Sequence, residues 1–293
     1  MASLKEFRTR IASVQSTQKI TAAMKMVSGA KLRRAEEAAL RARPYVEHLQ
    51  RILGYLLSRA KDLKKPPALL TGRAPIKTVL LLVFSSDRGL CGSFNTNIGR
   101  ETRKIIASYQ QKGINVQIMC VGRKAADFLK NQGFAIQEVL VDHMHPQRLL
   151  KTSQELSQKV LSLFQAEEVD SVHLLYRRFL SATHSPFVDR RVIPVEDTFQ
   201  ETETLAAIPE IEPSEEEVLR LLLEHHLELQ LYQAGLESFA SEQGARTTAM
   251  DNATRNAEDM LARLTLHYNR TRQALITKEL TEIISGAETL GNG

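Results

Sequence analysis

The chain offers few residue groups whose types and spacing could do chemistry. The best candidate is the loop 85–95, SSDRGLCGSFN, which follows an apolar run and precedes a helix-forming stretch, the place where open α/β sheets bind ligands. The loop contains neither GxxxxGK[ST] nor GxGxxG, the patterns that cradle phosphates. We therefore expect no nucleotide site there. Anion binding by the turn 89–92 stays open as the hypothesis of an α/β ligand-binding enzyme with a helical arm.

The histidines and cysteines make weak metal or nucleophile signals. His143 and His145 are two residues apart without further ligands nearby, and residues 224–226 (EHH) do not match HExxH. Cys91 and Cys120 form no CxxC pair and are too few for a disulfide framework, so we interpret both as buried thiols. The sequence thus predicts no catalytic residue, no metal site and no cofactor.

The middle of the chain alternates between strand and helix patterns. Residues 78–84, TVLLLVF, form a continuous β-branched and aliphatic run, typical of a strand buried on both faces of a parallel sheet. The alternation predicts βαβ units and therefore a Rossmann-like, mostly parallel sheet. The further strands are expected at 116–121, 135–141, 171–176 and 190–195, and the helices at 95–111, 124–131 and 147–164.

Both ends of the chain have the periodicity of long amphipathic helices. Residues 3–59 would form a helix about 85 Å long, too long for a compact domain of this size. The apolar stripe of this helix is expected at Leu4, Phe7, Ile11 and Val14, then Ile20, Met24 and Val27. The step from Val14 to Ile20 changes the phase, so a strict heptad is not predicted.

The C-terminal helix is expected over residues 214–285. Its stripe follows spacings of three and four residues at Met250, Ala253, Ala257, Met260, Leu264, Tyr268, Thr271 and Leu275. Two such helices require each other, so we predict an α+β fold in which they form a long antiparallel coiled coil around an inserted α/β domain. The expected domains are 1–62, 75–196 and 212–287. The apolar stripe continues through Ile276, Leu280, Ile283 and Ile284, beyond the reach of the first helix, and needs another partner.

Composition and charge narrow the class of protein. The 293 residues are 43% hydrophobic and 25% charged, which excludes collagen-like and disordered chains. The longest apolar run, residues 79–84, is far too short to span a bilayer, and the N-terminus lacks the apolar region of a secretory signal. The net charge of +5 conceals +8 over residues 1–60 and −9 over 196–224. The basic helix is compatible with nucleic acid, an anionic surface, an acidic protein or a solvated face.

Three motifs, one near each end and one in the middle, carry a resemblance that covers essentially the whole chain. They are residues 11–27 (IASVQSTQKITAAMKMV), residues 86–92 (SDRGLCG) and residues 268–287 (YNRTRQALITKELTEIISGA). With these motifs in this order, the chain resembles the gamma subunits of F-type rotary ATP synthases. The resemblance implies a non-catalytic rotor shaft that transmits torque between a membrane proton rotor and catalytic subunits.

The resemblance also implies the partners and their contacts. The partners would be the alpha and beta subunits, the epsilon subunit and the membrane c-ring, with no nucleic acid, on the cytoplasmic face of a bacterial inner membrane. The implied beta-subunit contacts are Met24, Lys25, Arg246, Met250, Arg272, Gln273 and Thr277, and the implied foot on the rotor ring and epsilon is Arg43, Pro44, Tyr45, Ile211 and Glu212. Thr247 departs from the family's usual Met, and the chloroplast-type dithiol insertion is missing.

Overall fold

The computed structural model describes residues 4–60, 66–195, 212 and 214–291. They form two compact units, and both long helices, α1 (Leu4–Ala60) and α6 (Glu215–Gly291), contribute to each. We call Ser28–Arg246 the sheet unit, and Met1–Val27 with Thr247–Gly293 the terminal unit. The three expected domain ranges divide the chain differently and stay a prediction. Within the described residues, no helix is long and apolar enough to cross a membrane.

The sheet unit contains one five-stranded sheet in the order β3-β2-β1-β4-β5. The first four strands are parallel and β5 is antiparallel to β4, so the predicted mostly parallel sheet is confirmed. The strands are β1 (Thr78–Phe84), β2 (Asn115–Val121), β3 (Glu138–Leu140), β4 (Ser171–Arg177) and β5 (Phe187–Ile193), and the shorter helices are α2 (Ala68–Thr71), α3 (Phe94–Gln111), α4 (Arg123–Asn131) and α5 (Pro146–Gln165).

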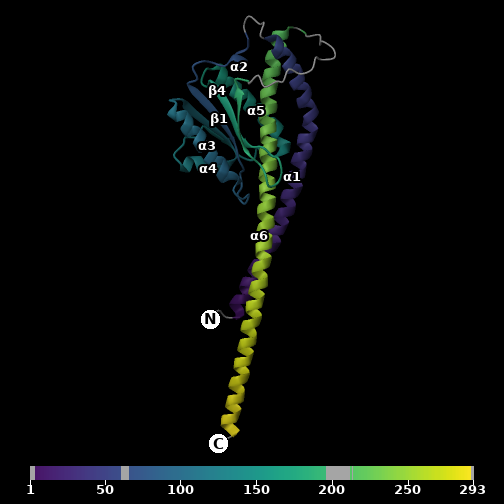
Figure 1. Ribbon diagram of the computed structural model, residues 1–293, viewed down its shortest axis with the longest axis vertical. Helices are drawn as coiled ribbons and strands as arrows, with labels where there is room; N and C mark the ends of the chain where they lie inside the picture. Colours follow the sequence, from purple (N-terminus) through teal and green to yellow (C-terminus); the bar gives the residue numbers. More distant parts are fainter. Residues whose placement is uncertain (1–3, 61–65, 196–211, 213, 292–293) are drawn as a thin grey trace. The chain divides into compact units, whose positions relative to one another are not determined.

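Helices cover both faces of this sheet (Figure 1). Alternate residues of β1 point to opposite faces, so Val79 and Leu81 pack with α3 and α4, whereas Leu80 and Leu82 pack with α5, α6 and Ala35 of α1. Burial on both faces explains why the sequence of β1 is an unbroken apolar run. Helices α5 and α6 approach closely at Gly235, where an added Cβ would lie 2.5 Å from Leu149 Cδ1 and would force that side chain to shift.

The sheet differs from the prediction at its two edges. The last strand begins at Phe187, three residues before the expected start, and ends at Ile193, two before the expected end. Strand β3 has only three residues, and α2 was not predicted. Edge strands are paired on one side only, so their bounds depend on the neighbour and on exposed polar residues such as Asp189 and Arg191, which give no continuous apolar signal.

Within the sheet unit, α1 and α6 pack antiparallel through leucines. Leu53 and Leu56 of α1 are buried against Leu219 and Leu223 of α6, and all four are at most 2% exposed. Leu57 is buried in the same cluster, and Val218 and Leu222 of α6 pack against it. The predicted antiparallel pairing of the two helices is confirmed here by ordinary apolar packing.

Within the terminal unit, the same two helices pair through a different surface. From residue 4 to residue 21 the less exposed positions of α1 are 4, 7, 11, 14, 18 and 21, and from residue 254 to residue 271 those of α6 are 254, 257, 261, 264, 268 and 271. Both sets keep alternating spacings of three and four residues, which is a strict seven-residue repeat. The predicted change of phase between Val14 and Ile20 is therefore wrong, and the half-buried Ala22 and Met24 depart from the repeat only after Thr21.

The predicted stripe was wrong because polar residues occupy part of the seam, which is the face along which α1 and α6 pack in the terminal unit. The expected stripe residues Ile20, Val27 and Met260 are 57%, 56% and 53% exposed, whereas the polar Thr21 is buried and Leu261 is half-buried in their place. Apolar residues next to the seam positions therefore gave the predicted stripe the wrong phase. Geometry of the seven-residue repeat, rather than hydrophobicity, identifies the seam.

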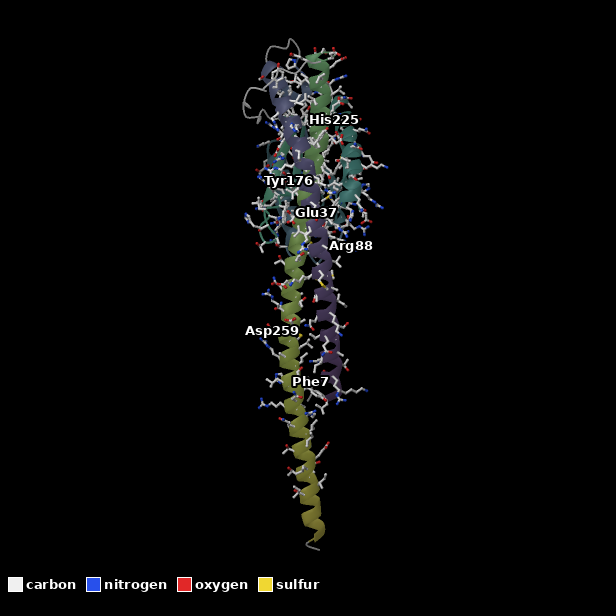
Figure 2. All side chains as sticks on the ribbon, turned by 90° about the vertical axis from the view of Figure 1, so that its right-hand side faces the viewer. Phe7, Glu37, Arg88, Tyr176, His225 and Asp259 are labelled. Atoms are coloured by element: carbon white, nitrogen blue, oxygen red, sulfur yellow. The ribbon has the colours of Figure 1, made fainter. Side chains whose placement is uncertain are left out.

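Helix α6 continues past the start of α1. Near the start of α1, Arg8 Nε donates to the Tyr268 hydroxyl of α6 at 3.0 Å, and the end of α6 extends further without α1 beside it (Figures 1 and 2). Ile276, Leu280 and Ile283 are 54–72% exposed there. The uncovered apolar stripe predicted for this end is confirmed.

Candidate partner-contact surfaces

The position where an α/β sheet of this type binds ligands is filled by the chain's own helix α6. Strand order reverses between β1 and β4, and the loops after these two strands form the ligand crevice in related folds. Ser241 Oγ of α6 donates to the Arg177 carbonyl at the end of β4, at 3.0 Å. Arg246 Nη2 donates to the carbonyls of Arg88 and Gly89 after β1, at 3.3 and 3.2 Å.

Arg246 is held in this position by a buried ion pair. Arg246 and Glu242 are 8% and 7% exposed, and Arg246 Nη1 lies 2.5 Å from Glu242 Oε1. Burial raises the pKa of Glu242, and the charge of Arg246 opposes that rise. The guanidinium thus ties α6 to the loop after β1, a role that the sequence analysis did not assign. The spacing of four residues between Glu242 and Arg246 was the available signal.

The loop itself is ordered by its polar side chains. Asp87 accepts hydrogen bonds from the backbone N–H groups of Arg123 and Asp142, each at 3.0 Å, and joins the ends of three strands. Gly122 follows β2 with φ of 106°, and a Cβ there would lie 2.0 Å from the Ser85 carbonyl oxygen. The backbone is therefore packed directly against the loop after β1, the hypothetical anion-binding segment.

Both cysteines are buried free thiols, as predicted. Burial raises the pKa of Cys91, and it raises that of Cys120 to about 12. The thiolate is the reactive form, so these side chains stay protonated and unreactive at neutral pH.

The histidines likewise serve local structure. His143 Nδ1 lies 2.9 Å from Thr152 Oγ1, and the side chain of His145 accepts from the Gln147 N–H as the N-cap of α5. In the part of the chain that the structure describes, no group of three or more His, Cys, Asp or Glu side chains is arranged to hold a metal ion.

Lys25, one of the expected contacts, lies in the polar seam of the terminal unit. Its Nζ is 2.5 Å from Asp251 Oδ1, and Arg255 lies 2.9 Å from the other oxygen of the same carboxylate. The hydrogen bond from Lys25 is the largest cause that lowers the pKa of Asp251. Met24 is half-buried beside it and Met250 is buried. The structure therefore groups Met24, Lys25 and Met250 around one section of the paired helices.

Arg272, Gln273 and Thr277 lie on the section of α6 that follows the contact of Tyr268 with Arg8 of α1. All three side chains are exposed, and Thr277 Oγ1 donates to the Gln273 carbonyl at 2.9 Å. Gln273 and Thr277 share a helix face because they are four residues apart. Of the seven expected beta-subunit contacts, these three and Lys25 have exposed side chains, whereas Arg246 and Met250 are buried.

The expected foot residues are exposed wherever the structure describes them. Arg43 forms an ion pair with Glu47 at 2.9 Å, Pro44 lies within α1 without ending it, and Tyr45 is 57% exposed. Glu212 is exposed, and Ile211 lies outside the described residues.

Comparisons with known proteins agree over the whole chain. The family described as ATP synthase matches residues 3–290. The ATP synthase gamma chain of Rhodospirillum rubrum is 45% identical, covering 99% of this chain and 100% of that one. The central stalk and c-ring structure of the Tetrahymena thermophila mitochondrial ATP synthase has a TM-score of 0.58 at 25% identity, covering 80% of this chain and 99% of that one. A Euglena gracilis mitochondrial ATP synthase rotor shares the fold, with a TM-score of 0.65 at 20% identity, over 93% and 98% of the two chains.

Proposed function

Because this chain belongs to the ATP synthase gamma chain family, we propose that it is the central rotor shaft of a rotary ATP synthase. In this role it transmits torque between a membrane proton rotor and the catalytic alpha and beta subunits during ATP synthesis or hydrolysis. The observation that carries the proposal is the pairing of α1 with α6, a helix of 77 residues whose end continues past α1. A paired helix of this length suits the transmission of torque over a distance that no side chain spans.

The shaft has no catalytic role of its own in this proposal. The best support is the filled crevice at the strand switch point, where Arg246 and Ser241 of α6 bond the ends of β1 and β4. A nucleotide would have to displace a buried ion pair to enter. We place ATP chemistry in the alpha and beta subunits and the chain on the cytoplasmic face of a bacterial membrane, bound through epsilon and the c-ring.

The exposed set Arg272, Gln273 and Thr277 is our proposed torque contact with the beta subunit. It presents a guanidinium, an amide and a hydroxyl on the part of α6 that α1 does not cover. Charge-assisted hydrogen bonds to carboxylates of a partner contribute about 1.5–3 kcal/mol each when water is excluded. Met24, Lys25 and Met250 would support the same contact from the paired section. Arg246 would act indirectly, because its donors already bond Glu242 and the loop after β1.

The foot proposal rests on Arg43, Pro44, Tyr45 and Glu212. These exposed residues combine a cation, an aromatic ring and a carboxylate in the sheet unit. They would contact the polar loops of the c-ring and the epsilon subunit, together with Ile211.

The test is reconstitution of the full chain with the alpha, beta and epsilon subunits and the membrane proton rotor in sealed vesicles. Changing Arg272→Ala and Gln273→Leu together should leave assembly intact and lower ATP hydrolysis and synthesis about tenfold or more, since two charge-assisted or amide bonds are lost. The control is Arg263→Ala, an exposed cation on the same helix that forms no ion pair with a described residue. Unchanged turnover in both directions would refute the proposed contact.

A further inference from the structure

Three helices of the sheet unit, α1, α5 and α6, line a cavity of about 710 Å³ that is open to solvent. One wall is a face of α1 and another is a face of α6, the helices on which Figure 2 labels Glu37 and His225, and the first turns of α5 close the third side. The α1 lining residues at 31, 34, 38, 41 and 45 keep spacings of three and four, so they present one face over about 21 Å. The volume lies within the range of small-molecule sites, about 300–1,000 Å³.

The α1 wall is strongly cationic. Lys31, Arg34 and Arg41 line it, and none of them forms an ion pair with an acid in the described residues. Glu228 is the one acidic side chain among the lining residues, and it lies 3.7 Å from His225 Nδ1 on its own helix. The cavity therefore carries an excess of positive charge that its own walls do not neutralise.

His145, at the start of α5, lies in the positive electrostatic field of these cations. Burial lowers its pKa, and the charges of Lys31, Arg34 and Arg148 lower it further. Cations depress the pKa of an imidazole because they oppose a second positive charge. The same field favours an anion placed beside α1.

The opposite walls are mainly apolar. Leu150 of α5 and Leu229, Tyr232 and Phe239 of α6 line them, and the ring of His145 lies edge-on to Phe239 with centroids 6.0 Å apart. Burial raises the pKa of Tyr232, so its ring stays neutral at physiological pH. Cations thus lie on one wall and apolar surface on the other two.

We propose that this cavity binds an amphiphilic anion, a medium-chain alkyl carboxylate, with the carboxylate beside Arg34 and Arg41 and the chain against Leu229 and Phe239. A simple inorganic anion would leave the apolar walls hydrated, and an uncharged alkyl chain would leave the cations without a counter-charge. A ligand with one charged head and one apolar tail matches both surfaces.

The experiment titrates the full chain with decanoate labelled with ¹³C at its carboxyl carbon, below its micellar concentration. We expect saturable one-to-one binding by carboxyl chemical shift and by calorimetry. Decyltrimethylammonium and 1-decanol should bind at least about tenfold more weakly, since each lacks the anionic head that the cations favour.

Matched variants locate the site. Arg34→Gln with Arg41→Gln should weaken decanoate binding about tenfold or more, whereas Arg33→Gln with Arg51→Gln, exposed cations of α1 that do not line the cavity, should change it less than about twofold. Leu150→Gln should also weaken binding. Its control is Leu221→Gln, because both leucines are 51% exposed and Leu221 lies outside the cavity. All four arginines are exposed, so the helical fold should persist in each double variant.

Three results would overturn the proposal. They are decanoate binding without saturation, the ammonium analogue binding as tightly as decanoate, and the Arg33 and Arg51 control losing as much affinity as the lining variant. A fourth result would reassign the cavity: an acidic amphipathic helical peptide binds and loses affinity in the Arg34 and Arg41 variant, while decanoate does not bind. The surface would then be a helix-docking groove.

Discussion

The two paired sections of α1 and α6 use the same helices for different purposes. In the sheet unit the contact is made by buried leucines, Leu53 and Leu56 against Leu219 and Leu223. In the terminal unit it includes polar pairs: Gln18 Nε2 donates to Glu258 Oε1 at 3.1 Å, and Thr254 Oγ1 donates to Thr21 Oγ1 at 2.8 Å. Lys25 and Asp251 add an ion pair.

The apolar section and the polar section contribute different properties: the first contributes stability, and the second fixes the register of the two helices. Leucine layers contribute free energy through the apolar area that they remove from water, and they tolerate other partners of similar shape. Polar pairs in a helical seam contribute less and fit one alignment only, because a shift leaves a donor or an acceptor unmatched. A shaft that transmits rotation benefits from helices that cannot slip along each other. We therefore interpret the polar seam as the register device of the terminal unit.

The largest expected effect comes from breaking the leucine section. Leu53→Ala or Leu223→Ala should each lower the free energy of unfolding by about 2–5 kcal/mol, because both side chains are fully buried and leave a cavity. Urea unfolding followed by circular dichroism measures the loss. Leu40→Ala, at a leucine of α1 that is 65% exposed, should stay within about 0.5 kcal/mol of the wild type. Equal losses in the buried and exposed variants would contradict the apolar role of this section.

An intermediate effect is expected at the hydroxyl pair of the seam. Thr254→Val should destabilise the terminal unit by about 0.5–1.5 kcal/mol, because the buried Thr21 hydroxyl loses the donor from which it accepts and keeps only its own bond to the Gln18 carbonyl. Adding Thr21→Val should recover part of that loss, since two apolar groups of the same shape replace the pair. Hydrogen exchange of the amides in residues 11–25 gives both values, and losses that simply add would argue against coupling across the seam.

The smallest effect is expected at the exposed ion pair, and it depends on pH. The pKa of Asp251 is lowered in the folded chain, mainly by the hydrogen bond from Lys25, so this pair stabilises the fold above the ordinary pKa of an aspartate, about 3.9. The contribution is lost as the pH falls through the lowered folded value. Lys25→Met should therefore reduce stability at pH 7 and have no effect below the folded pKa of Asp251. Added salt should reduce the effect at pH 7.

Within the sheet unit, the pH dependence of stability expected at Glu242 has the opposite sign to that expected at Asp251. Its folded pKa is raised by burial, so its contribution is present below the ordinary pKa of a glutamate and is lost as the pH rises through the raised value. The pH profile of Glu242→Gln should thus diverge from that of the wild type in the direction opposite to Lys25→Met. Parallel profiles for the two variants would mean that the two carboxylates do not differ in environment.

Much of the site could be placed from the sequence because its signals are local. The exposed end of α6 is visible as an apolar stripe at Ile276, Leu280 and Ile283 that outlasts the first helix. The assignment of Arg272, Gln273 and Thr277 came from the resemblance, and the structure adds that they are exposed. It could not be predicted that Arg246 is buried, since the carbonyls of Arg88 and Gly89 that it bonds become its neighbours only through folding.

The sequence by itself determined the two long helices, the alternating strands and helices between them, and the antiparallel pairing of the ends. These follow from periodicity and from prolines, which act over a few residues. Tertiary structure alone decided which face of α1 forms the seam at Thr21, the antiparallel edge strand β5, and the cationic cavity beside α5. The physical reason is that polar seam residues, edge strands and cavities are defined by partners distant in the chain, and a pattern within one segment carries no information about them.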